Sequence, residues 1–137
     1  MPETPDYPHD ASQEVLVSAA GLREFLTKLL VKKGMFAAEA QIGAARLVEA
    51  DLRGIQSHGC RMVPRYLKAM DEGHIDPRGQ ILKLTTTPAM GVLDGGRGLG
   101  HVAATKAMQM AIDMARNVGT GTVAVKNSQH FGAAAIY

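Results

Sequence analysis

The spacing of apolar residues changes near residue 75, and this change limits the fold more than any other feature of the sequence. Before it, apolar residues recur three and four positions apart, as on one face of a helix. After it, stretches rich in β-branched residues alternate with one more helical stretch. We therefore predict a mixed α/β chain with a flexible arm (1–16), a helical N-terminal block (17–75) and the start of an α/β domain (76–137).

Three helices are expected in the N-terminal block. The first begins at Ser18 and ends at Gly34, because serine is a good helix cap and glycine a common helix stop. The second covers about 37–51 and the third about 62–71, each with its apolar residues on one face. The short turn between the first two helices predicts that they pack as a hairpin.

The second half of the chain predicts a strand-helix-strand unit. Residues 81–87 and 90–94 are expected to be neighbouring strands, 101–117 a helix and 122–125 a further strand. The last residues are apolar and look like the first turn of another helix. We therefore expect the α/β domain to be truncated at its C-terminus and the chain to be part of something longer.

Composition excludes several classes of protein. The net charge is +2, with no basic run that could follow a phosphate backbone, so nucleic acid is not an expected partner. The sequence has no apolar run of membrane-spanning length and no signal peptide, so a cytoplasmic protein is expected. The single cysteine, Cys60, fits a reducing compartment. No cysteine or histidine pair has zinc-ligand spacing, and His9, His74 and His101 are expected at structural or surface positions.

A glycine cluster, 95–100, follows one predicted strand and precedes a helix, as a dinucleotide-binding turn does. Such a turn needs an acidic residue at the end of the next strand to bind ribose, and here that strand ends in Lys126 and Asn127. A tight structural turn is therefore the favoured interpretation. A small dinucleotide-binding protein is kept as an alternative that requires measurable cofactor affinity.

Two polar segments contain a histidine in a setting suited to proton transfer. The first is the loop 51–59, where His58 lies between Ser57 and Gly59. A histidine titrates near neutral pH, so it can give a proton to a carbonyl oxygen and take it back. A loop histidine is more often a surface or capping residue, so this segment alone decides nothing.

The second segment, 126–132, follows the last predicted strand, where sheets of this type often place ligand sites. His130 is the candidate acid or base, and Asn127 and Ser128 supply hydrogen-bonding groups. The alternative is that Ser128 simply caps a following helix.

Two motifs together resemble the malate/L-lactate dehydrogenase family, whose members do not use a Rossmann domain. The motifs are Asp-Leu-Arg-Gly-Ile-Gln-Ser-His-Gly at 51–59, followed by Met-Val-Pro-Arg-Tyr at 62–66, and Asn-Ser-Gln-His-Phe-Gly-Ala at 127–133. The resemblance extends from about Val17 to the last residue. It implies hydride transfer between NAD or NADP and a small 2-hydroxy or 2-oxo acid, on a homodimer whose subunits both contribute to the active site.

The resemblance also implies roles for particular residues. His58 and His130 take the positions of the family's two motif histidines and are the predicted catalytic residues, with His58 the first choice as proton donor. Ser57, Asn127 and Arg53 are the predicted substrate-binding residues.

The sequence departs from the family at one position. Some relatives carry an arginine for the substrate carboxylate where this chain has Met62, so Arg53 or Arg65 is expected to serve instead.

Family members are more than twice this long, so most of the cofactor-binding residues are expected beyond residue 137 and the chain alone is expected to be inactive. The alternative class is a non-catalytic helical dimerisation or interaction module, which the leucine-rich first helix would suit.

Overall fold

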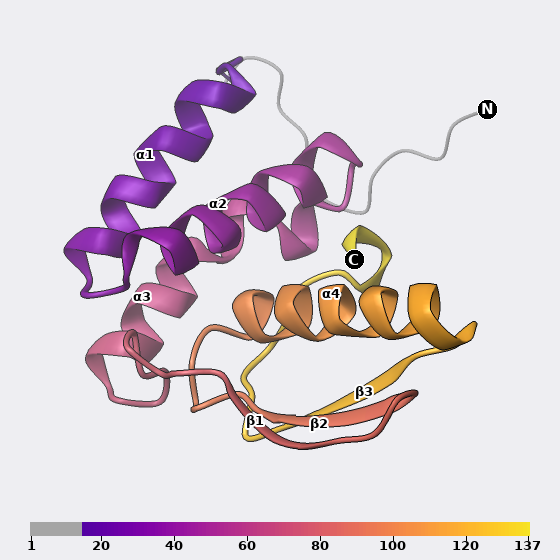
Figure 1. Ribbon diagram of the computed structural model, residues 1–137. Helices are drawn as coiled ribbons and strands as arrows, with labels where there is room; N and C mark the ends of the chain where they lie inside the picture. The colour runs from indigo at the N-terminus through magenta and orange to yellow at the C-terminus, as the bar shows by residue number, and fades with distance from the viewer. Residues whose placement is uncertain (1–14) are drawn as a thin grey trace.

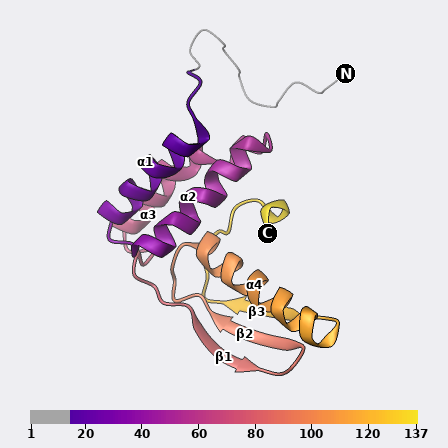
Figure 2. The same cartoon turned by 45° about the horizontal axis from the view of Figure 1, so that its top comes forward.

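A computed structural model describes residues 15–137, so nearly all of the predicted arm lies outside the described residues. The N-terminal block contains three helices, α1 (Ala19–Lys32), α2 (Ala37–Leu52) and α3 (Val63–Asp71). α1 and α2 pack side by side, which confirms the predicted hairpin (Figure 2). No helix within 15–137 is both long and apolar enough to cross a membrane.

Local sequence explains where the first helix begins and ends. The Ser18 hydroxyl oxygen accepts a hydrogen bond from the Gly21 amide at 3.0 Å, which satisfies one of the unpaired amides of the first turn. After the last turn, Gly34 adopts a φ of +104°, a conformation that other residues rarely take. Both ends therefore lie where the sequence predicted them.

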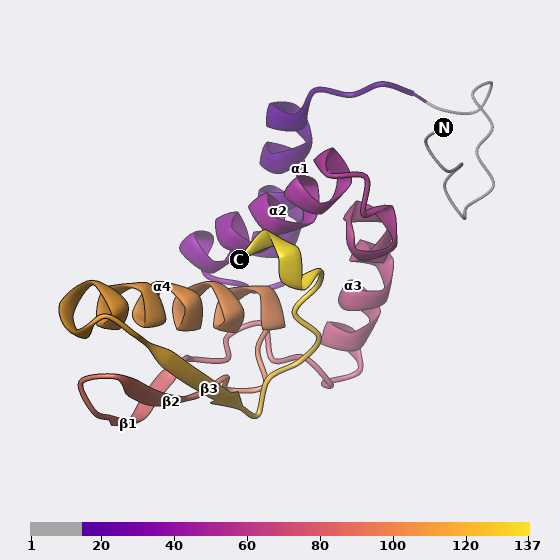
Figure 3. The same cartoon turned by 90° about the vertical axis from the view of Figure 1, so that its right-hand side faces the viewer.

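The second half forms a small sheet covered by one helix (Figures 1 and 3). β1 (Leu82–Thr86) pairs antiparallel with β2 (Met90–Asp94), and β2 pairs in parallel with β3 (Thr122–Lys126). The parallel pair is joined by α4 (Gly100–Val118), which packs against β2 and β3. The predicted strand-helix-strand unit and the mixed α/β class are confirmed.

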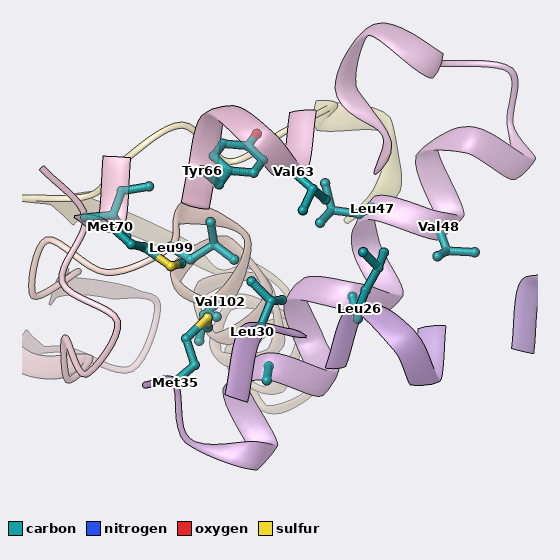
Figure 4. Close-up of a cluster of buried hydrophobic side chains, with 13 residues drawn as sticks. Leu26, Leu30, Met35, Leu47, Val48, Val63, Tyr66, Met70, Leu99 and Val102 are labelled. Carbon is teal, nitrogen blue, oxygen red and sulfur yellow. The ribbon is translucent and has the colours of Figure 1, made fainter. Parts of the chain in front are cut away.

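One continuous core joins the helical block to the start of α4 (Figure 4). Leu47 is fully buried on α2, and Leu99 and Val102 bring the beginning of α4 into contact with the three N-terminal helices. Burial of large aliphatic side chains supplies about 1.5–3 kcal/mol each. This shared core fixes the position of α4 relative to α2 and α3. Its members are Leu26, Leu30, Met35, Ala40, Ala44, Leu47, Val48, Val63, Tyr66, Met70, Ile75, Leu99 and Val102.

The segment after β3 returns to the helical block. Ser128 does not cap a helix: its hydroxyl donates to the Gln129 carbonyl oxygen at 3.2 Å, and helical structure begins only at the short turn η3 (Ala134–Ile136). The alternative prediction of a helix capped by Ser128 is therefore wrong. Arg46 of α2 and Arg53, the residue that follows α2, donate to backbone carbonyl oxygens of η3 at 2.8 and 3.0 Å. These bonds hold the returning segment against α2.

β3 lies at one edge of the sheet, beside an apolar groove. The groove has a volume of about 620 Å³ and is bounded by α4, β3 and η3. Phe131, which lines it, is 46% exposed. Neither His58 nor His130 lines this groove.

Candidate active site

The structure brings the two predicted catalytic histidines together. His58 comes from the loop between α2 and α3, and His130 comes from the segment after β3. Their ring centroids are 5.4 Å apart and their planes are inclined by 30°. Two side chains 72 positions apart in sequence therefore form one pair, as the family resemblance implied.

The loop that carries His58 is held by Asp51. The Asp51 carboxylate accepts a hydrogen bond from the Cys60 amide at 2.9 Å. Between them, Gly59 is buried, and a Cβ there would lie 1.7 Å from Asp51 Oδ1. Glycine is required at this point because the backbone passes so close to the carboxylate. Next to it, Ser57 Oγ and His58 Nδ1 are 2.8 Å apart, so the serine fixes the ring's orientation.

Tyr66, which the sequence placed on an apolar helix face and at the end of a family motif but gave no role, positions His130. The Tyr66 hydroxyl lies 2.8 Å from His130 Nδ1, while the rest of its ring is buried in the core (Figure 4). Burial raises the pKa of Tyr66 to about 12, so the phenol keeps its proton and can donate it. The sequence signal for this role was the place of Tyr66 at the end of the family motif 62–66, seven residues after a predicted site loop.

The charge state of His130 is set by its surroundings. Partial burial, together with the nearby positive potential of His58 and Arg65, lowers the pKa of His130 from its ordinary value. The ring is therefore neutral at neutral pH. If Tyr66 donates to Nδ1, the remaining proton of His130 lies on Nε2, which has no protein partner among the described residues.

A third histidine lies behind the pair. His101, in the first turn of α4, is fully buried, and its ring stands edge to face with Tyr66 at 5.4 Å. Within the described part of the chain, neither of its ring nitrogens has a hydrogen-bond partner. Burial, then electrostatic repulsion from His130, Arg46 and His58, lowers the pKa of His101 to about 4. The expectation that His101 is structural fits this neutral, enclosed ring.

A cavity of about 370 Å³ opens beside His130. Residues of α3 form one wall, including Arg65, Tyr66 and Lys68, and Gln129 and His130 form part of the other. Its size suits a small organic acid. Its lining combines a hydrogen-bonded histidine with cationic side chains, which an anionic ligand requires.

Two other predicted site residues are held by protein groups. Arg53 pairs with Glu49 at 2.7 Å and also donates to the Ala135 carbonyl oxygen. The Asn127 side chain donates to Asp94 at 3.0 Å, and its backbone has a φ of +52°. Both residues tie elements of the fold together at these contacts, and their substrate-binding role stays a prediction.

The glycine cluster after β2 packs against protein backbone. A Cβ on Gly96 would lie 2.4 Å from the Gln80 carbonyl oxygen, and one on Gly100 would lie 2.1 Å from that of Gln129. These glycines are needed for close contacts within the chain, and they leave no room for a pyrophosphate at those faces. The turn does not fit a dinucleotide. In residues 15–137, no group of three acidic, histidine or cysteine side chains is arranged to bind a metal ion.

Comparison with known proteins agrees with this geometry. Residues 17–137 match the family model described as malate/L-lactate dehydrogenase. The chain belongs to the malate/L-lactate dehydrogenase family. The predicted resemblance and fold class are thereby confirmed.

Named members of the malate/L-lactate dehydrogenase family match over most of this chain. The L-sulfolactate dehydrogenase of Methanocaldococcus jannaschii is 42% identical over 84% of the chain, and the malate dehydrogenase of Pyrococcus abyssi is 41% identical over 85%. The solved M. jannaschii sulfolactate dehydrogenase superposes with a TM-score of 0.84 and 39% identity, over 88% of this chain and 35% of that one.

The malate dehydrogenase structure from Pyrococcus horikoshii gives a TM-score of 0.83 at 35% identity, over 88% of this chain and 34% of that chain. The chain thus spans about a third of the length of the relatives it matches: 33% of the M. jannaschii sequence and 32% of that from P. abyssi. These relatives are hydroxyacid dehydrogenases, so the family is one of oxidoreductases.

Proposed function

We propose that this chain supplies the proton-transfer half of a dehydrogenase active site that interconverts a small 2-hydroxy acid and its 2-oxo acid. The observation that carries the proposal is the pair formed by His58 and His130, of which His130 lines a cavity of about 370 Å³. A malate-like or lactate-like acid is of the right size for this cavity. The family's malate and sulfolactate dehydrogenases support the reaction class.

His58 is the proposed proton donor. Ser57 holds its Nδ1, and its Nε2 has no partner among the described residues, so this nitrogen can carry the proton that moves. During reduction, the proton leaves Nε2 for the oxygen of the keto group, which becomes a hydroxyl. During oxidation of the hydroxy acid, the same nitrogen takes the proton back.

His130 is proposed to orient the keto oxygen. Its lowered pKa keeps the ring neutral, and a hydrogen bond from the Tyr66 hydroxyl to Nδ1 leaves Nε2–H as a donor. A neutral donor polarises the carbonyl without competing as a second acid. The two histidines therefore have different tasks: His58 transfers the proton, and His130 holds the oxygen that receives it.

The proposal includes NAD or NADP as hydride carrier and a homodimer as the active form. The glycine turn does not fit a dinucleotide, so only proton transfer and substrate orientation are assigned to this chain's residues. Because the chain spans about a third of its relatives, we propose that it is inactive alone.

The test is a chimera in which residues 17–137 replace the matching part of the M. jannaschii sulfolactate dehydrogenase. Oxidation of NADH and NADPH is followed with pyruvate, oxaloacetate and sulfopyruvate, and the 137-residue chain is assayed in parallel. The chimera should turn over at least one acid. His58→Ala should reduce kcat by about 10²–10⁴-fold, the usual worth of an acid–base group, whereas the exposed His74→Ala should not.

A folded dimeric chimera whose activity is indifferent to His58→Ala would contradict the assignment of the donor. A folded chimera without any activity would favour the alternative, a non-catalytic dimerisation module. Turnover by the 137-residue chain would contradict its proposed inactivity.

A further inference from the structure

Besides Tyr66, four titratable side chains of α3 and the turn that follows it line the cavity beside His130, and within the described residues only one of them is a cation without an acidic partner. Lys68 lies 3.6 Å from Glu72, and His74 lies 3.8 Å from the same carboxylate. Arg65 lines the cavity, is exposed, and forms no hydrogen bond or ion pair with another residue in the described part of the chain. Among the described residues, the cavity therefore presents one guanidinium without an acidic partner.

From this arrangement we infer that Arg65 binds the carboxylate of the 2-oxo or 2-hydroxy acid, an inference that rests on the proposed function. The guanidinium has a planar set of donors that matches a carboxylate with two parallel hydrogen bonds. Arg65 precedes Tyr66, whose hydroxyl holds His130. Arg65 and His130 line the same cavity, so a carboxylate on Arg65 places the adjacent keto carbon in the cavity that His130 borders.

Two other positions are less suited to this role. Met62 has no charge and packs against the buried core. Arg53 already has Glu49 as its counter-ion, at 2.7 Å. Binding a carboxylate there would require breaking that pair, whereas Arg65 loses no ion pair with a described residue.

The electrostatics of the site agree with this assignment. The charge of Arg65 is among the causes that lower the pKa of His130, so the guanidinium lies within electrostatic range of the ring. A bound carboxylate would neutralise that charge and raise the proton affinity of His130. Binding at Arg65 is therefore visible at His130 even without turnover.

The test uses the 137-residue chain and two-dimensional NMR, with oxamate as a small isosteric analogue of pyruvate and methyl oxamate as its uncharged control. The variants are Arg65→Gln, Arg65→Lys and Lys68→Gln. Lys68→Gln is the matched control, because it removes one positive charge from the same helix and the same cavity. For each protein we measure the oxamate Kd and the pH titration of His130.

Oxamate should bind the unaltered chain and shift the His130 signals, and methyl oxamate should bind far less. Arg65→Gln should weaken oxamate binding by at least about tenfold, the worth of a charged hydrogen bond. It should also raise the pKa of His130 in the absence of ligand. Arg65→Lys should retain the low pKa and part of the affinity, and Lys68→Gln should change the affinity less than twofold.

No oxamate binding to the folded chain, or equal binding by the chain and Arg65→Gln, would overturn the assignment. An affinity loss in Lys68→Gln as large as in Arg65→Gln would also overturn it, because general positive potential would then explain both. These outcomes are independent of the chimera assay. If the chimera is active but its activity does not depend on Arg65, only the role of Arg65 in carboxylate binding is refuted. If the chain binds oxamate through Arg65 but the chimera is inactive, only the proposed reaction is refuted.

Discussion

Lowering the pH from 7 to 5 should destabilise this chain chiefly through His101, whose pKa is lowered further than that of any other described histidine. Its ring is fully buried, and its pKa is lowered to about 4 by burial, then by electrostatic repulsion from His130, Arg46 and His58. In the unfolded chain the same ring titrates near pH 6.5. The unfolded state therefore binds a proton between these values while the folded state does not, so stability is complete above about pH 6.5 and falls as the pH drops towards 4.

The size of the effect follows from the two pKa values. Each tenfold difference in proton affinity is worth about 1.4 kcal/mol, which gives a total loss of about 3 kcal/mol by pH 4. About 2 kcal/mol of this is lost between pH 7 and pH 5, a window in which most carboxylates remain ionised.

The assay is urea denaturation at pH 7 and pH 5, followed by circular dichroism, on the chain and on His101→Leu. Leucine is a suitable replacement because neither ring nitrogen of His101 bonds to a described residue. The variant should lose about 2 kcal/mol less than the parent over this pH range. A variant of the exposed His74, His74→Leu, should behave as the parent does. Equal losses in the chain and in His101→Leu would show that His101 is not the proton-linked group.

Three further outcomes follow from the structure. In Gly59→Ala the new methyl group would lie 1.7 Å from Asp51 Oδ1, so this variant should lower the free energy of unfolding by about 2 kcal/mol or more, measured by thermal unfolding. Gly54→Ala, in a turn with open space around it, should cost less. Leu47→Ala, in the fully buried core, should cost about 2.7–5 kcal/mol in urea unfolding, and a loss below 1 kcal/mol would contradict the packing. Burial and the hydrogen bond with Asp51 raise the pKa of Cys60 to about 12, so iodoacetamide at pH 8 should alkylate it more slowly in the folded chain than in urea, and comparable rates would count against this environment.

Regular elements with clear local patterns were predictable from the sequence. β2 was predicted at its observed bounds, 90–94, because it is a short apolar run between a proline-containing turn and glycines. α4 extends one residue further at each end than the predicted 101–117. In both cases the deciding information lies within the segment itself.

The contacts that assemble the site were not predictable in the same way. The motifs identified His58 and His130, but their separation of 5.4 Å depends on the core that fixes α4 and on the arginines that hold η3 against α2. Tyr66 was recognised as an apolar helix position and as part of the motif 62–66, but not as the partner of His130, because helix periodicity describes its buried ring and not its hydroxyl. Arg65 and Arg53 are equally cationic in the sequence, and only their three-dimensional partners distinguish them.

The edge position of β3 affects how the isolated chain behaves in solution. An edge strand leaves a row of backbone amides and carbonyls available to another chain, and here the row lies beside an apolar groove of about 620 Å³. Such a combination promotes intermolecular pairing and aggregation as the concentration rises. The solubility of the purified chain should therefore depend more on what covers this edge than on the stability of its helical core.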